Sequence, residues 1–189
     1  MPYSYINAKN QTYYLHVSHV NRANPRYYFS MKTQGHLLEA IPNGFEVYEN
    51  PNGRVFLRKK QPRLITQKEE SIVEVGLQKY SNIRDHKLVV KKKTIIVYTA
   101  DQDRDELREI MKSLNPVMFD EKMLNQLVNY SPILQFELVD PKERKFITRR
   151  YCFIGSIDDW IEIGQEDILT KLVHKYIGHL GKDSYYELE

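Results

Sequence analysis

The feature that most constrains the fold is a two-residue alternation of side chains that recurs through the first sixty residues. This period is typical of β-strands, whose successive side chains point to opposite faces of a sheet. It predicts two antiparallel strands joined through the polar stretch SHVNRANP. The positions on one face of these two strands are Tyr13, Leu15 and Val17, then Tyr27, Phe29 and Met31.

A second pair of alternating runs flanks a turn sequence in the segment GFEVYENPNGRVFLRKK. Asn50-Pro51-Asn52-Gly53 is a strong turn signal, because Asn and Gly tolerate positive φ angles. This is the clearest hairpin in the chain. Pro62 then ends the strand pattern, and Thr66 with Glu69 has the spacing of a capping box that opens a helix.

The rest of the chain alternates between helical and strand patterns. Strands are predicted near 86–91 and 94–99, and a helix follows with Leu107, Ile110, Met111 and Leu114 on one face. Asn115-Pro116 should end that helix. The remaining predictions are a helix from Asp120 to Tyr130, strands around 134–138, 145–154 and 160–163, and a helix over 168–180 that Gly181 ends.

Grouped strands with hairpin-like connections indicate an α+β fold with mainly antiparallel sheets and about four helices. A β-rich N-terminal part should precede a helix, β-hairpin and helix arrangement. We expect a β-rich aromatic region at 1–62 and an α+β region at 63–189, or one continuous domain.

Charge is divided unevenly along the chain. Residues 1–100 hold 16 Lys and Arg against 7 Asp and Glu, a net +9, whereas residues 101–189 hold 12 against 18, a net −6. Such a split is compatible with a nucleic-acid-binding face, with attraction between two regions, or with simple clustering of surface charge.

Composition also bears on location. No apolar run approaches the ~20 residues needed to cross a bilayer, and the first residues lack the apolar core of a signal peptide. Cys152 is the single cysteine and has no internal disulfide partner. We therefore expect a cytoplasmic protein without a membrane segment.

Familiar catalytic and cofactor motifs are missing. The eight glycines form neither a P-loop nor a dinucleotide-binding fingerprint, and there is no nucleophile elbow. Cys152 lies in a predicted strand and is interpreted as a buried, inert thiol. The histidine spacings do not suit a metal site. The sequence thus assigns no catalytic residue, metal ligand or cofactor.

One compact group of acids lies beside the single tryptophan: Asp158, Asp159 and Glu162 with Trp160. An enzyme with an unfamiliar site would have to use this group. The simpler interpretation is that the acids decorate a strand end and that Trp160 lies in the core.

Residues 41–56 resemble the opening of a WW domain, with Pro42, Gly44 and an aromatic residue followed by Glu, and then Gly53-Arg54 and Phe56. Phe45 stands where that family has tryptophan, and no second tryptophan followed by proline closes a third strand. The missing rings form the groove that grips proline-rich peptides, so the resemblance implies a hairpin and no ligand.

The N-terminal order YYLH, RYYFS and GFEVYENPNGRVFLRK also resembles that of conserved bacterial proteins of unknown function that share this aromatic part. This resemblance implies no activity.

Two functions remain. The leading hypothesis is a non-enzymatic protein-interaction module with an unknown protein partner, since no catalytic group is present and Tyr and Phe on short strands suit recognition. The alternative is nucleic-acid binding through the basic, aromatic N-terminal half. Its candidate contacts are Arg26, Arg54, Arg58, Lys59, Lys60 and Arg63, with Tyr14 and Tyr28 as stacking platforms.

Overall fold

The computed structural model describes residues 1–18, 25–114, 119–154 and 157–188. Two compact units emerge, and the chain passes between them three times. One unit combines residues 1–61 with 105–128, and the other combines 62–104 with 129–189.

The described residues confirm the expected α+β class, with helices and antiparallel sheets. The helices are α1 (Gln67–Tyr80), α2 (Arg104–Leu114), α3 (Glu121–Leu127) and α4 (Leu169–Tyr176), with 3₁₀ turns at Ile177–His179 and Asp183–Tyr185. The strands are β1 (Ser4–Ile6), β2 (Thr12–Ser18), β3 (Arg26–Ser30), β4 (Phe45–Glu49), β5 (Val55–Lys59), β6 (His86–Lys91), β7 (Thr94–Ala100), β8 (Tyr130–Asp140), β9 (Lys145–Ile154) and β10 (Ile157–Ile168).

The N-terminal unit contains both predicted strand pairs. β1, β2 and β3 form an antiparallel sheet in that order, and β4 pairs with β5 as a hairpin. Their inner faces meet where the Tyr27 ring packs edge-on against Phe45, with centroids 5.4 Å apart, and where the Tyr5 hydroxyl donates to Glu49 at 3.0 Å. The connection predicted between β2 and β3 falls mostly on residues 19–24, outside the described residues.

The predicted turn at residues 50–53 is confirmed, and a buried amide holds it. Gly53 has a φ of +79°, and an added Cβ would lie 3.1 Å from the Asn7 side chain. Asn7 donates through Nδ2 to the Gly53 carbonyl at 2.6 Å and accepts from the Gln11 amide at 2.7 Å. The β1–β2 turn is therefore fastened to the β4–β5 turn.

The helical segment between β7 and β8 belongs to the same unit. Lys9 donates from Nζ to the carbonyl of Gln126 at 2.8 Å and lies 3.3 Å from that of Val128. A cation at this position offsets the partial negative charge of the α3 C-terminus. The helix α3 ends at Leu127, earlier than predicted, because β8 begins at Tyr130.

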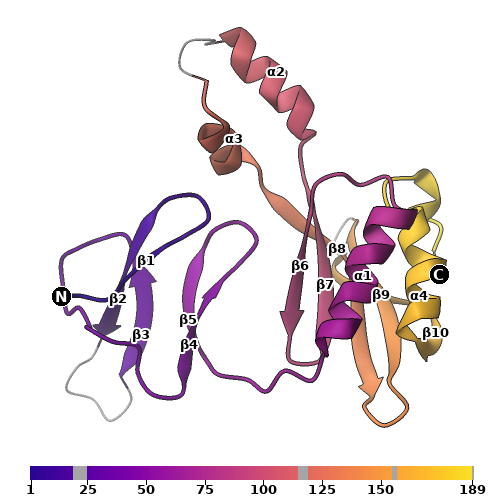
Figure 1. The fold of residues 1–189 in the computed structure, drawn as a ribbon, viewed down its shortest axis with the longest axis horizontal. Helices are drawn as coiled ribbons and strands as arrows, with labels where there is room; N and C mark the ends of the chain where they lie inside the picture. The colour runs from indigo at the N-terminus through magenta and orange to yellow at the C-terminus, as the bar shows by residue number, and fades with distance from the viewer. Residues whose placement is uncertain (19–24, 115–118, 155–156, 189) are drawn as a thin grey trace. The chain divides into compact units, whose positions relative to one another are not determined.

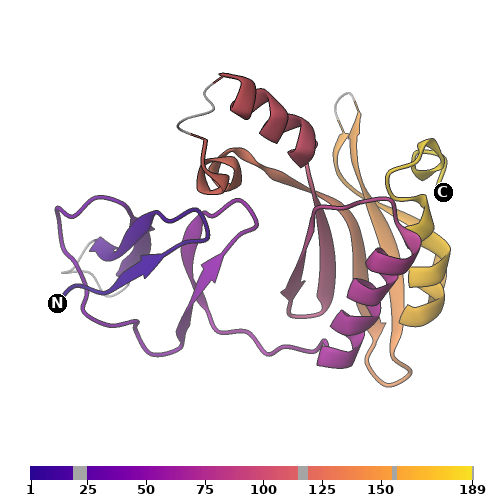
Figure 2. The same cartoon turned by 45° about the horizontal axis from the view of Figure 1, so that its top comes forward.

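The C-terminal unit is built on one five-stranded antiparallel sheet with the order β10-β9-β8-β7-β6. Each strand pairs with its neighbour in sequence, so the sheet is a meander. Helices α1 and α4 lie side by side along one side of it, as two views show (Figure 1, Figure 2).

These two helices and one sheet face form the main hydrophobic core. Val73 and Leu77 of α1 and Val173 of α4 pack with strand residues such as Val97 and Phe136. The predicted capping box opens α1: the Glu69 amide donates to Thr66 Oγ1 at 3.3 Å, and the Thr66 amide donates to Glu69 Oε2 at 2.8 Å. Cys152 is buried, as expected for a structural thiol.

Two further predicted features differ in the structure. The last strand is much longer than the predicted 160–163, because it continues through a register shift between Ile163 and Asp167. The predicted helix α2 is present, but its apolar stripe contains no buried residue, and Leu114 is 80% exposed. The expected stop at Asn115-Pro116 lies outside the described part of the chain.

Candidate functional site

The five-stranded sheet has a second face, on which no described helix of its own unit packs. Along β7, Ile95 and Val97 point into the helical core, so Ile96 and Tyr98 point to the opposite side. The strand register carries this alternation across the whole sheet. We call this second side the open face; its residues are Lys87, Val89, Lys91, Thr94, Ile96, Tyr98, Gln135, Glu137, Ile147, Arg149, Tyr151, Phe153, Asp158, Trp160 and Glu162.

The open face is more apolar than a solvated sheet face should be. Antiparallel sheets with one wet side normally place polar side chains there. Here Ile96 and Ile147 are buried, and Phe153 is 79% exposed. Apolar side chains at outward positions favour coverage by another molecule or segment.

An aromatic pair marks the β9–β10 end of this face. Tyr151 and Trp160 are direct cross-strand partners, with ring centroids 5.1 Å apart and planes at 74°. Both rings are half-buried. The structure thus places Trp160 on the open face and not in the core, where the sequence interpretation put it, because β10 alternates with Ile161 and Ile163 facing the helices.

Some of the charges on the open face are paired with one another. Arg149 contacts Glu137 and lies 3.5 Å from Glu162, and Lys93 also contacts Glu137. Burial would raise the pKa of Glu137, but the hydrogen bonds from Lys93 and Arg149 outweigh it and hold that pKa below its usual value. These groups are compensated charges.

The Tyr151 hydroxyl donates to Asp158 beside the aromatic pair. This hydrogen bond, together with burial, raises the pKa of Tyr151. Asp159 points to the other side of the strand, and its carboxylate accepts the Trp160 amide at 2.7 Å. Of the acids grouped by sequence, therefore, Asp158 and Glu162 share the open face and Asp159 does not.

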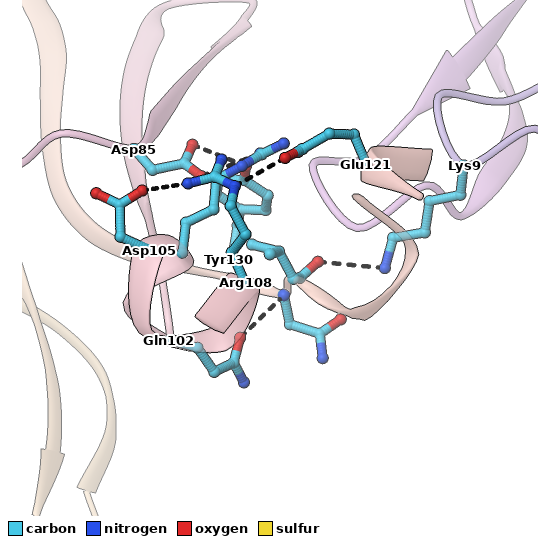
Figure 3. A network of polar contacts seen from close by, with 10 residues as sticks. Lys9, Asp85, Gln102, Asp105, Arg108, Glu121 and Tyr130 are labelled. Atoms are coloured by element: carbon cyan, nitrogen blue, oxygen red, sulfur yellow. Dashed lines mark hydrogen bonds and ion pairs between the residues drawn. The ribbon is translucent and has the colours of Figure 1, made fainter. Parts of the chain in front are cut away.

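Polar contacts join the start of β8 to the residues just before β6 and just after β7 (Figure 3). The Tyr130 hydroxyl donates to Asp85 at 2.8 Å, and the Asn129 amide donates to Gln102 at 3.3 Å. Burial and the Asp85 carboxylate raise the pKa of Tyr130 to about 12. Its phenol is therefore neutral at pH 7 and acts as a structural donor.

Within the helical segment itself, Arg108 of α2 joins two acids (Figure 3). Its guanidinium donates to Glu121 of α3 at 2.7 Å and also contacts Asp105 one turn earlier. The ion pair with Glu121 connects the two helices.

The structure divides the residues predicted to contact nucleic acid among several surfaces. Tyr14, Tyr28 and Arg26 share the outer face of the β1–β3 sheet, where Tyr28 stacks on His16 at 5.1 Å. Arg58 lies on the outer face of the hairpin, over the Tyr48 ring at 4.3 Å and 2.8 Å from Glu46.

The other predicted contacts lie elsewhere. Lys59 follows Arg58 on the strand and points to the opposite face, while Arg54 and Lys60 are exposed at the two ends of β5. Arg63 belongs to the C-terminal unit and pairs with Glu70. Within the N-terminal unit, the predicted contacts therefore lie on more than one strand face.

Among residues whose positions are described, no group of three or more His, Cys, Asp or Glu side chains could hold a metal ion. The described helices also include none long and apolar enough to cross a membrane. Comparison of the chain with protein-family models, curated proteins and solved structures gives no match.

Sequence reasoning missed the open face, although the sequence carries a signal for it. The run Ile95-Ile96-Val97-Tyr98 is apolar at consecutive positions, and Tyr151 and Phe153 alternate with buried residues of β9. A strand that is apolar on both sides indicates a sheet with both faces covered. Helices α1 and α4 cover one face of this sheet.

Proposed function

We propose that this protein is a non-enzymatic protein-interaction module and that the open face is its contact surface. The observation that carries the proposal is the apolar and aromatic character of a sheet face opposite the helical core. Exposed aromatic side chains surrounded by polar groups are typical of protein-binding surfaces, where Tyr and Trp supply much of the affinity.

The charge arrangement favours a protein over a polyanion at this face. A nucleic-acid surface needs cations that can contact phosphates. Arg149 and Lys93 are instead engaged by Glu137, and Asp158 and Glu162 add negative charge beside Trp160.

Selection from a displayed random-peptide library on the purified protein tests this proposal. We expect enriched peptides whose synthetic forms bind by calorimetry and lose about tenfold or more in affinity in the Phe153→Ser and Trp160→Ser variants. The matched control is Val75→Ser, because Val75 is an apolar residue of the same unit that is 58% exposed on α1.

The control should bind as the wild type does. Failure to enrich any peptide, or equal binding by all three variants, would contradict the proposal. Circular dichroism spectra of each variant confirm that folding is retained.

A second candidate, nucleic-acid binding, is favoured by one observation in the N-terminal unit. Tyr14, Tyr28 and Arg26 share one outer face, and Tyr28 is 46% exposed. Exposed rings beside a cation suit the stacking of unpaired bases.

Fluorescence anisotropy of labelled single-stranded RNA and DNA tests this candidate at low and near-physiological salt. The candidate predicts binding that weakens steeply with salt and that falls in Tyr28→Ser and Arg26→Ala. Lys171→Ala serves as the control, because Lys171 belongs to the other unit, pairs with Asp167 and is not among the predicted contacts. The absence of binding at low salt would remove the candidate.

A further inference from the structure

The open face ends at the edge of the sheet, and this edge limits which kinds of partner can bind there. In the described sheet, β10 is the last strand and pairs with β9 alone. An edge strand of this kind offers backbone groups to an extended segment of another chain. The aromatic pair Tyr151–Trp160 lies directly beside this edge.

The negative charge of β10 favours extended segments that are positively charged. Residues 157–168 contain five Asp and Glu and no Lys or Arg. Beyond the register shift, Glu166 and Asp167 already pair with Lys145 and Lys171, at 3.4 and 3.2 Å. Around Trp160, by contrast, the described ion pairs include one long contact, from Arg149 to Glu162 at 3.5 Å, and none to Asp158 or Asp159. This part of the edge repels anionic partners and attracts cationic ones.

The aromatic pair adds a second attraction for cations. The faces of Trp and Tyr rings carry negative potential and bind ammonium and guanidinium groups. Asp158 and Glu162 lie two residues on either side of Trp160 on the same face, about 7 Å from it along the strand at the usual rise. A long cationic side chain over the Trp160 ring can therefore reach both carboxylates.

We propose that this edge binds an extended Lys- or Arg-rich segment of the partner protein, with one cationic side chain placed over Tyr151 and Trp160 between Asp158 and Glu162. The proposal rests on the function proposed above for the open face and specifies its partner. The acids then serve recognition in addition to discouraging the β10 edges of two copies from pairing.

Trp160 provides a direct measurement, because it is the single tryptophan of the chain. Its fluorescence is recorded while the full-length protein is titrated with oligolysine, with lysine-acetylated oligolysine and with oligoglutamate. We expect a saturable change with oligolysine alone, weakened by salt. The Asp158→Asn/Glu162→Gln double variant should bind oligolysine about tenfold more weakly or worse.

The control is the Glu166→Gln/Asp167→Asn double variant, which removes the same charge from the same strand at positions already paired with lysines. It should retain wild-type affinity. The absence of a saturable change with oligolysine, or equal losses in the two double variants, would overturn the proposal.

The library selection separates this outcome from failure of the proposed function. Enriched peptides that are neutral or acidic and still depend on Trp160 would leave the interaction surface in place and refute the cationic partner. Selection without any Trp160-dependent peptide would refute both.

Discussion

At the scale of single residues, Glu69 performs two structural tasks with one carboxylate. It completes the capping box of α1 with Thr66, and it accepts a hydrogen bond from Arg144 Nε at 2.9 Å. Arg144 lies in the turn between β8 and β9, so this contact ties the start of α1 to that turn. Burial would raise the pKa of Glu69, but hydrogen bonds from Arg144 and Thr66 outweigh it and lower the pKa below 4.5.

A carboxyl group with a lowered folded-state pKa stabilises the fold above its unfolded-state pKa, and this contribution is lost as the pH falls through the folded value. We expect Glu69→Gln to reduce the free energy of unfolding by about 1–3 kcal/mol at pH 7, since Gln keeps the cap and loses the charge. The difference from wild type should shrink as the pH falls below 4.5. Urea unfolding across this pH range measures it.

Glu70→Gln is the matched control for that measurement. Its partner Arg63 is half exposed, so the free energy of unfolding should fall by no more than about 1 kcal/mol. If the free energies of unfolding of Glu69→Gln and the wild type differ by a constant amount down to pH 3, this result would contradict the ion pair assigned to Glu69 and Arg144.

The same residue shows how far sequence reasoning reaches. The Thr66-x-x-Glu69 spacing predicts the cap because both partners lie within one helical turn. Arg144 lies 75 residues away, and only the folded sheet brings it to Glu69. For the same reason, the hydrogen bond from Asn7 to Gly53 could not be predicted, although the turn at residues 50–53 could.

At the scale of elements, local patterns predicted most of the strands and helices but missed β1 and did not show where the elements end. The strand β10 continues past Ile163 because Gly164, with a φ of +68°, carries the register shift. A Cβ there would lie 1.9 Å from the Tyr176 hydroxyl, so glycine is required by a helix elsewhere in the sequence. The face of Trp160 was missed because the predicted strand was too short to set its alternation against the helical core.

At the scale of the whole molecule, one passage between the two compact units falls between Gln61 and Pro62. The grouping of residues 105–128 with the N-terminal unit could not be predicted, because it depends on contacts such as that of Lys9 with α3. The main hydrophobic core lies entirely within the C-terminal unit. The buried hydrophobic side chains described in the N-terminal unit are Leu15, Val55, Leu124 and Val128, and polar contacts such as that of Asn7 with Gly53 add to them.

This division predicts how the molecule unfolds. Asn7 is 3% exposed and connects the two turns of the N-terminal unit, so Asn7→Ala leaves buried backbone groups without partners. We expect the free energy of unfolding of this unit to fall by about 2 kcal/mol. For a unit this small, that change lowers the midpoint of thermal unfolding by roughly 10 °C. Glu69→Gln should instead lower the midpoint of the C-terminal unit.

Differential scanning calorimetry of the two variants and the wild type checks this expectation. Two transitions should appear, with Asn7→Ala shifting one and Glu69→Gln shifting the other, because each substitution removes contacts inside a different unit. A single transition that both variants lower together would show that the units unfold cooperatively. In that case, a partner bound at the open face would stabilise the whole chain and not the C-terminal unit alone.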